Sequence, residues 1–262
     1  MTDRVVPIWW DEAADGPTNM AADEVLADEA IRHDGLVMRL YSWSAPAVSL
    51  GAFQSVAEAE AATAIAGLPL VRRPSGGGAI VHGSDLTYAA AVPRSHPWAE
   101  TPQAFYDSLH EALVAALADV GVAARLHAPS RGDPPADDLF CFSRRAPGDV
   151  VVGPVDPDVG GPSPKIMGSA QRRLGTTVLQ HGSLLLAANP AVGDAVRHAG
   201  LAEIIAPRQV SASRLANAWV RLIGETIGIE SQSRPAPFAE GREAAIAERA
   251  ARFRDPRWTR RR

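Results

Sequence analysis

Apolar residues recur at helical spacing in two long stretches of the chain. The first stretch follows Thr101-Pro102 and ends before Gly121, and the second follows Ser211 or Ser213, either of which can cap a helix. A stripe of this kind faces a protein core, so the pattern predicts two scaffold helices. Their apolar members are Phe105, Leu109, Ala112, Leu113, Ala116, Leu117 and Val120 in the first, and Leu215, Trp219, Leu222, Ile223 and Ile227 in the second.

A third helical stretch, MAADEVLADEAIRHD, lies near the N-terminus. Thr18 or Asn19 is the expected cap, and Gly35 ends the pattern. Two short runs rich in strand-forming residues follow, Leu36–Tyr41 (LVMRLY) and Ala47–Leu50 (AVSL), on either side of the loop SWSAP. This arrangement predicts a hairpin within a sheet.

Five further apolar runs, GAIVH, TYAAAV, GDVVV, KIMGSA and TTVLQHGSLLL, are bounded by glycine and proline and are mostly too short for helices. They predict a sheet of several strands, and with the helices they indicate an α+β fold. Residues 153–164 (GPVDPDVGGPSP) are expected to form an exposed loop between two strands, because proline and glycine dominate them. Lys165 begins the strand after this loop.

The chain contains no internal repeat and reads as one domain with a tail. A polar stretch, ESQSRPAP, separates the predicted catalytic domain, residues 1–235, from residues 236–262. The latter segment is predicted to be a basic helical tail, solvated and fraying at its end.

Composition restricts the class of protein. The 262 residues are 46% hydrophobic, enough for a full core, and the formal net charge of −4 gives no basic field for nucleic acid. The N-terminus carries acids where a signal peptide needs an apolar core, and no stretch approaches the roughly 20 apolar residues of a membrane span. A single cysteine forms no internal disulfide, which is typical of a reducing compartment. We therefore expect a cytoplasmic protein.

The basic residues are almost all arginine: Lys+Arg total 26, and Lys165 is the only lysine. Arginine is always charged and planar, whereas lysine is a compact cation whose pKa the protein can adjust. Lys165 is therefore a candidate for chemistry that arginine cannot perform. The alternative is a lysine retained by chance.

The only cysteine, Cys141, lies between Phe140 and Phe142 and close to Arg144 and Arg145. Neighbouring cations favour the nucleophilic thiolate over the thiol. Packing in the core as a small apolar residue is the alternative.

The segment RRPSGGGAIVH, residues 72–82, places a paired arginine beside three consecutive glycines. Glycine lets backbone amides approach a ligand closely, and arginine binds phosphate or carboxylate in a forked geometry. The spacing matches neither the P-loop nor the dinucleotide-binding motif. A glycine-rich turn in a hairpin is the alternative, and His82 taken alone is more typical of a structural histidine.

The segment KIMGSAQRR, residues 165–173, has small residues at 168–170 that leave room for a ligand. Strand alternation puts Lys165 and Ser169 on one face. His181, in the following strand, is either a buried hydrogen-bonding residue or a participant in catalysis.

Together with LQHGSLLL, NMAADEVL and RLYSWSAPAVSLGAFQ, these segments resemble the biotin/lipoate A/B protein ligase family over about Asn19 to Leu186. The resemblance implies a mixed, largely antiparallel central sheet flanked by helices, a catalytic domain like that of class II aminoacyl-tRNA and biotin synthetases. It also implies a bent tunnel for a lipoyl or octanoyl chain.

The resemblance also implies the site. Lys165 contacts the acyl carbonyl or acyl phosphate, and Cys141 matches the nucleophile of the octanoyltransferase group within this family. No metal ligand is expected. The substrate pocket is expected to contain Arg72, Ser75, Gly76, Gly77, Gly78, His82, Gly168, Ser169, Ala170 and His181.

Three functions stay open. The first is transfer of an octanoyl or lipoyl group through a Cys141 thioester, without a cofactor, from octanoyl-acyl carrier protein to a lipoyl domain of a 2-oxoacid dehydrogenase or to glycine cleavage H protein. The second is an ATP- and Mg²⁺-dependent lipoate ligase, which Gly78 favours because cysteine octanoyltransferases often carry arginine there. The third is a non-catalytic relative that binds acyl groups or carrier domains. A monomer is the default expectation.

Overall fold

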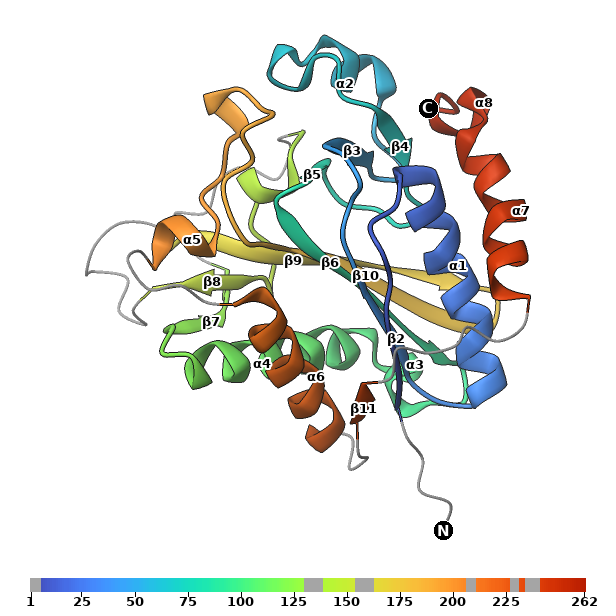
Figure 1. Ribbon diagram of the computed structural model, residues 1–262, viewed down its shortest axis with the longest axis vertical. Coiled ribbons are helices and arrows are strands. Elements are labelled where there is room, and N and C mark those ends of the chain that lie inside the picture. The colour runs from blue at the N-terminus through green and yellow to red at the C-terminus, as the bar shows by residue number, and fades with distance from the viewer. Residues whose placement is uncertain (1–5, 130–138, 154–162, 206–210, 227–230, 234–240) are drawn as a thin grey trace.

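The computed structural model describes residues 6–129, 139–153, 163–205, 211–226, 231–233 and 241–262. An eight-stranded sheet forms its centre (Figure 1), with the order β11-β1-β2-β6-β10-β9-β8-β7. The pairs β11/β1 and β1/β2 are parallel and the others antiparallel. The strands are β1 (Val6–Trp10), β2 (Val37–Tyr41), β6 (Asp85–Pro93), β7 (Ala124–Leu126), β8 (Val150–Val152), β9 (Lys165–Leu174), β10 (Thr177–Leu185) and β11 (Ser231–Ser233).

Helices cover both faces of this sheet. On one face, α1 (Gly16–His33) lies between the sheet and α7 (Arg242–Arg254), and on the other α4 (Pro102–Asp119) packs beside α6 (Ala212–Thr226) (Figure 1). The predicted α+β fold with a mixed, largely antiparallel sheet is confirmed. The shorter helices are α2 (Val56–Ala61), α3 (Pro97–Glu100), α5 (Leu201–Ile204), α8 (Pro256–Thr259) and the 3₁₀ turns η1 (Thr63–Ile65), η2 (Cys141–Ser143) and η3 (Asp194–Val196).

The central strand β6 explains why its sequence is apolar without interruption. Tyr88, Ala90 and Val92 belong to the core cluster below α4 and α6. Ala89 and Ala91 belong to the cluster below α1. A strand covered on both faces needs apolar side chains at every position rather than at every second one.

The two predicted scaffold helices are present as α4 and α6. Their stripes are buried at Phe105, Leu109 and Leu113 and at Leu215 and Trp219. The Ser211 hydroxyl accepts a hydrogen bond from the Arg214 amide at 3.4 Å, so Ser211 is the cap of α6. Ile227 lies outside the described residues.

The predicted cap of α1 is wrong. Asp15 caps the helix by accepting a hydrogen bond from the Thr18 amide at 2.9 Å. Asn19 is buried inside the helix, where its side-chain amide donates to the carbonyls of Ala14 and Ser42. The helix ends at His33, and its C-cap is Asp34, which adopts the left-handed conformation with φ 46°.

The predicted hairpin of Leu36–Tyr41 with Ala47–Leu50 is also wrong. The second run forms β3 (Ala47–Leu50), which pairs with β4 (Leu70–Arg72) and β5 (Ile80–His82) in a separate three-stranded sheet. The turn between the runs is held away from the hairpin geometry because Trp43 forms a bridge with Ala14 and donates its indole N–H to Thr87.

The C-terminal segment is packed on the core, in contrast to the solvated helix expected. Ala250 and Phe253 of α7 are buried against α1. After α8, the Trp258 indole N–H donates to the Arg72 carbonyl at 2.8 Å, and the Arg72 Nε–H donates to the Thr259 carbonyl at 2.8 Å. Residues 234–240 lie outside the described residues, so the domain boundary at residue 235 stays a prediction.

Most of the predicted loop 153–164 lies outside the described residues, although β8 ends before it and Lys165 begins β9 directly after it. In the described ranges, no helix has both the length and the apolar character needed to cross a membrane.

Candidate active site

The glycine loop and the cysteine-bearing segment lie side by side. The Cys141 amide donates to the Ala79 carbonyl at 2.8 Å, and the Ala79 amide donates to the Leu139 carbonyl at 2.8 Å. A Cβ atom on residue 78 would lie 2.7 Å from the Cys141 nitrogen, closer than real Cβ atoms approach. Gly78 thus lets the loop lie directly against the backbone that carries the thiol.

Cys141 and Lys165 face each other. The Lys165 Nζ atom lies 3.6 Å from the Cys141 sulfur and 3.1 Å from the Cys141 carbonyl oxygen. It also forms a 2.7 Å ion pair with Asp149, and both side chains are buried, with 4% and 2% exposed. Burial alone would lower the Lys165 pKa, but the interactions with Cys141 and Asp149 outweigh it and raise that pKa above its ordinary value.

Gly168 provides the space for this ammonium group. A Cβ atom on residue 168 would lie 2.7 Å from Lys165 Cε and 2.8 Å from Nζ. Because the ion pair with Asp149 holds the lysine in place, the side chain has little freedom to move away.

Gly168→Ala is therefore expected to displace the ammonium group and to lower catalytic turnover by about tenfold, with a loss of stability of about 1 kcal/mol. Turnover rates and urea unfolding measure the two effects. Gly35→Ala is the matched control, because its Cβ atom would make only an ordinary contact of 3.7 Å. Equal turnover for the two variants would contradict the steric role of Gly168.

A chain of hydrogen bonds connects Asp149 to Tyr106, Ser169 and His110. The Tyr106 hydroxyl donates to the Asp149 carboxylate at 3.1 Å and accepts from the Ser169 amide at 3.2 Å. The Ser169 hydroxyl lies 2.7 Å from His110 Nε2, while His110 Nδ1 lies 2.6 Å from the Gly148 carbonyl. Burial lowers the pKa of His110 to about 3, so its ring is neutral and accepts the Ser169 proton.

Arg73 is a second buried cation near the thiol. Its guanidinium donates to the carbonyls of Ser49, Gly76 and Gly78 at 2.7–2.8 Å. Burial lowers the pKa of Arg73 to about 10, and the electrostatic interaction with Cys141 opposes that shift. Arg73 thus holds the glycine loop in shape and adds positive charge beside Cys141.

Arg72 lies elsewhere, although it was predicted to line the pocket. It is fully buried, and its guanidinium donates to the carbonyls of Gly51, Gln54 and Thr259. Arg72 is the last residue of β4 and Arg73 follows it in extended chain, so the two side chains point to opposite sides. Arg72 therefore joins the C-terminal segment to the loop after β3, and the structure does not bring it to Cys141.

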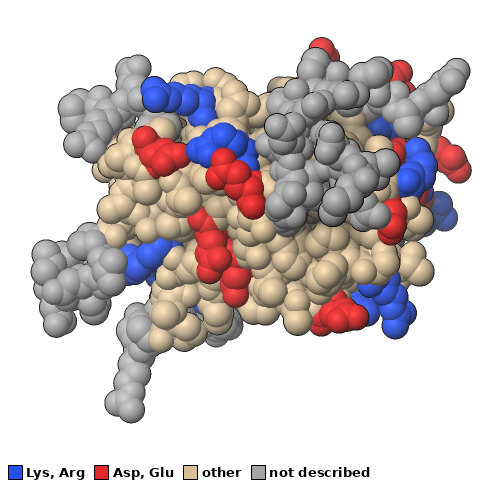
Figure 2. Space-filling model, turned by 90° about the horizontal axis from the view of Figure 1, so that it is seen from below, with Lys and Arg blue, Asp and Glu red and all other residues tan. Residues whose placement is uncertain are grey.

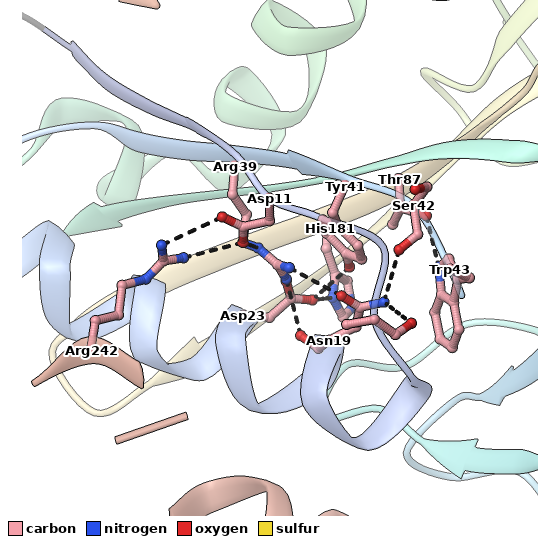
Figure 3. A network of polar contacts seen from close by, with 11 residues as sticks. Asp11, Asn19, Asp23, Arg39, Tyr41, Ser42, Trp43, Thr87, His181 and Arg242 are labelled. Atoms are coloured by element: carbon pink, nitrogen blue, oxygen red, sulfur yellow. Dashed lines mark hydrogen bonds and ion pairs between the residues drawn. The ribbon is translucent and has the colours of Figure 1, made fainter. Parts of the chain in front are cut away.

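His181 belongs to a buried polar network (Figure 3). Its Nδ1 atom lies 2.8 Å from the Asp23 carboxylate, and its Nε2 atom is hydrogen-bonded to the Ser75 hydroxyl. Asp23 also accepts from the guanidinium of Arg39 at 2.6 Å and from the hydroxyl of Tyr41 at 3.1 Å. Since both ring nitrogens have partners, His181 connects helix α1 to Ser75 at the start of the glycine loop.

His82 is held in a similar way. Its Nδ1 atom lies 2.7 Å from the Asp85 carboxylate and its Nε2 atom 2.9 Å from the Ser49 hydroxyl. The ring stacks on Trp43 with 3.9 Å between centroids. Burial alone would raise the pKa of Asp85, but His82 and further hydrogen bonds lower it, so the carboxylate stays charged and fixes the imidazole.

These groups surround one cavity with about 30 Å³ of open space. An eight-carbon chain needs far more room than this, so the bent tunnel stays a prediction. Among the predicted site residues, Cys141, Gly77, His82, Ser169, Ala170 and His181 line the cavity directly; Lys165, Ser75, Gly76, Gly78 and Gly168 contact or adjoin lining residues. The described residues contain no cluster of three potential metal ligands.

Four residues of this arrangement were not predicted: Arg73, Tyr106, His110 and Asp149. Asp149 precedes the strand VVV, and His110 interrupts the apolar stripe of α4 next to Leu109. A polar residue on a buried stripe must find a hydrogen-bond partner, which was the available signal.

Comparison with known proteins identifies relatives across this whole arrangement. Residues 15–217 match the family described as lipoyl protein ligase A/B catalytic domain. The chain is 34% identical over 241 residues to octanoyltransferase LipM of Symbiobacterium thermophilum, covering 88% of this chain and 80% of that protein. It is 29% identical over 272 residues to octanoyltransferase LipM of Moorella thermoacetica, covering 95% of each.

Solved structures share the fold. Lipoate-protein ligase A bound with ATP superposes with a TM-score of 0.73 at 21% identity, covering 98% of both chains. The bipartite lipoate protein ligase of Thermoplasma acidophilum gives a TM-score of 0.70 at 20% identity, covering 98% of this chain and 96% of that one. The resemblance predicted from the sequence is thus confirmed, and the protein belongs to the lipoyl protein ligase A/B catalytic domain family.

Proposed function

We propose that this enzyme is a cysteine-dependent octanoyltransferase, which moves an octanoyl group from acyl carrier protein to the lysine of a lipoyl domain. The observation that carries the proposal is the 3.6 Å contact between the only lysine and the only cysteine of the chain. The naming of relatives at 29–34% identity as octanoyltransferases supports it. The reaction takes place in the cytoplasm and needs neither ATP nor a metal ion.

In the first step, the Cys141 thiolate attacks the carbonyl carbon of the donor thioester, because Lys165 and Arg73 stabilise a negative charge at this sulfur. The new carbon–sulfur bond forms first and gives a tetrahedral intermediate, whose collapse breaks the donor's carbon–sulfur bond and releases the donor thiolate. The leaving thiolate takes a proton from the Lys165 ammonium group. Backbone amides of the glycine loop, which Arg73 holds in shape, are suited to stabilise the oxyanion of the tetrahedral intermediate.

In the second step, the lysine amine of the lipoyl domain attacks the Cys141 thioester. Carbon–nitrogen bond formation expels the Cys141 thiolate, and neutral Lys165 accepts the proton that the amine loses. We assign this role to Lys165 rather than to His82 or His181, because both ring nitrogens of each histidine already have partners. Lys165 thus acts first as an acid and then as a base, and it is protonated again at the end of the cycle.

Recipients of the proposed class are the lipoyl domains of 2-oxoacid dehydrogenases and glycine cleavage H protein. One solved relative is a ligase studied together with its E2 lipoyl domain, which supports this class of recipient. An ATP-dependent ligase is the competing function. The glycine at position 78 was the feature that favoured a ligase. The close approach of the loop to Cys141 accounts for a glycine at this position without a ligase function.

The test is intact-mass measurement after incubation with octanoyl carrier protein in the absence of ATP. We expect a covalent octanoyl adduct on the wild-type protein and none on Cys141→Ser. Addition of a lipoyl domain should then discharge the adduct onto the domain. Lipoyl-domain acylation that requires ATP and survives Cys141→Ser would show a ligase, and binding of the donor without an adduct would show a non-catalytic relative.

A further inference from the structure

A cluster of arginines without carboxylate partners lies near the C-terminus. The Arg261 guanidinium stacks 3.6 Å from the centre of the Trp258 ring, and that of Arg262 lies 5.8 Å from the centre of the Phe53 ring. Both arginines are exposed, as is Arg172 in β9. In the described part of the chain, none of these three arginines forms an ion pair.

These positive charges are close enough to repel one another. Partial burial lowers the pKa of Arg261, and so does repulsion from Arg252, Arg262 and Arg172, whereas Glu24 opposes this shift without reversing it. Of these neighbours, Arg252 is paired with Glu24. The remaining charges gain stability when an anion binds among them.

The cluster adjoins the candidate active site. Phe53 is 67% exposed, and its ring lies 3.7 Å from the position a Cβ atom of Gly76 would take. The next residue, Gly77, lines the cavity together with Cys141. Arg172 is two residues beyond Ala170, another lining residue. An anion held by the arginines would thus be close to the cavity.

The opposite side of the molecule has a different character. Figure 2 views the molecule from below Figure 1, away from α8, and acidic and basic side chains are interspersed there over a largely uncharged surface. Around α8, carboxylates also occur, but they are paired with other arginines, Asp255 with Arg257 and Glu60 with Arg260. Arg172, Arg261 and Arg262 are therefore left to bind an acidic partner.

We propose that Arg172, Arg261, Arg262 and Phe53 form the docking surface for the acidic carrier protein that delivers the acyl thioester. This inference rests on the proposed function. The arm of such a carrier is attached through a phosphodiester, which arginine binds well. The recipient instead presents a lysine ammonium group, which the same arginines repel. An exposed aromatic ring beside arginines is also typical of residues that dominate binding energy at protein interfaces.

The test uses the charge-reversed variant Arg172→Glu/Arg261→Glu in the full chain. Arg214→Glu is the matched control, because Arg214 is exposed on α6, on the other face of the sheet. Binding is measured with unacylated carrier protein that bears its phosphopantetheine arm. We expect its Kd to rise about tenfold at low salt and the difference to disappear in about 0.5 M salt, whereas the control matches the wild type.

Transfer kinetics supply the second measurement. The kcat/KM for octanoyl carrier protein should fall by the same factor, and that for octanoyl-N-acetylcysteamine, which has no phosphate or protein, should change less than about twofold. Loss with both donors would indicate a distorted cavity and would overturn the docking role. So would an unchanged Kd for the carrier, a selective loss of lipoyl-domain binding, or tighter binding of duplex RNA than of the carrier.

The measurement of carrier binding does not depend on whether the protein catalyses octanoyl transfer. A wild-type protein that neither donor acylates at Cys141 contradicts the proposed octanoyl transfer. The Kd of the unacylated carrier, compared between the charge-reversed variant and Arg214→Glu, still supports or overturns the docking surface in that case.

Discussion

Lys165→Met is expected to lower octanoyl transfer from carrier protein to lipoyl domain by about 10³-fold. The substitution keeps most of the length and volume of the side chain but removes its positive charge and its transferable proton. Cys141 loses the cation 3.6 Å from its sulfur, and the leaving thiolate loses its proton donor. Single-turnover measurements separate the two effects, since thioester formation and discharge are followed independently by mass.

Lys165→Arg is the companion variant, because it restores a charge without restoring a readily transferable proton. We expect it to recover the alkylation rate of Cys141 by iodoacetamide at pH 7, which Lys165→Met slows, and to leave transfer impaired. Cys141 is the only thiol, so alkylation reports on it alone. A methionine variant that transfers octanoyl at the wild-type rate would remove Lys165 from the mechanism.

The helices and the strand content could be predicted because burial acts on each element separately. Helix α4 has an apolar stripe because one of its faces is buried, and β6 is apolar throughout because both of its faces are buried. Both patterns can be recognised from the spacing of apolar residues in the sequence. The partners of a strand depend instead on distant contacts. The predicted hairpin of Leu36–Tyr41 with Ala47–Leu50 is wrong because the second run pairs instead with β4 and β5, which come later in the chain.

The site could be predicted only in part, for a related reason. Lys165 and Cys141 were singled out as the only lysine and the only cysteine of the chain, and the family resemblance pointed to the same two residues, which do meet. The choice between Arg72 and Arg73 depended on the orientation of one strand, which the sequence RR leaves open. Asp149 was missed because its importance comes from contact with Lys165 across neighbouring strands, not from its sequence neighbours.

Asp149→Asn is expected to lower transfer by about 100-fold, by releasing Lys165 from its position and by changing its proton affinity. In the wild type, Asp149 and Cys141 raise the Lys165 pKa against the effect of burial. In the variant, the interaction with Asp149 that raises the Lys165 pKa is lost, while burial still lowers this pKa. The Lys165 pKa therefore falls. Selective ¹³C labelling of lysine observes this change, because a protein with one lysine gives one side-chain signal to titrate.

The stability effect of this variant has a defined pH range. A lysine whose pKa is raised by folding contributes stability that is present below its unfolded value near 10.5 and is lost as pH rises through the higher folded value. At pH 7, Asp149→Asn leaves a buried ammonium without its carboxylate partner, which costs about 3 kcal/mol. Urea unfolding at pH 7 measures this loss.

The double variant Asp149→Asn/Lys165→Met separates stability from catalysis. It contains no unpaired buried charge at this point, so it should regain most of the stability that Asp149→Asn loses, while transfer stays as low as in Lys165→Met. Restored transfer in the double variant, or an unchanged lysine titration in Asp149→Asn, would contradict the role of Asp149 in positioning Lys165. Recovered folding with lost transfer would show that the ion pair serves the reaction and not only the core.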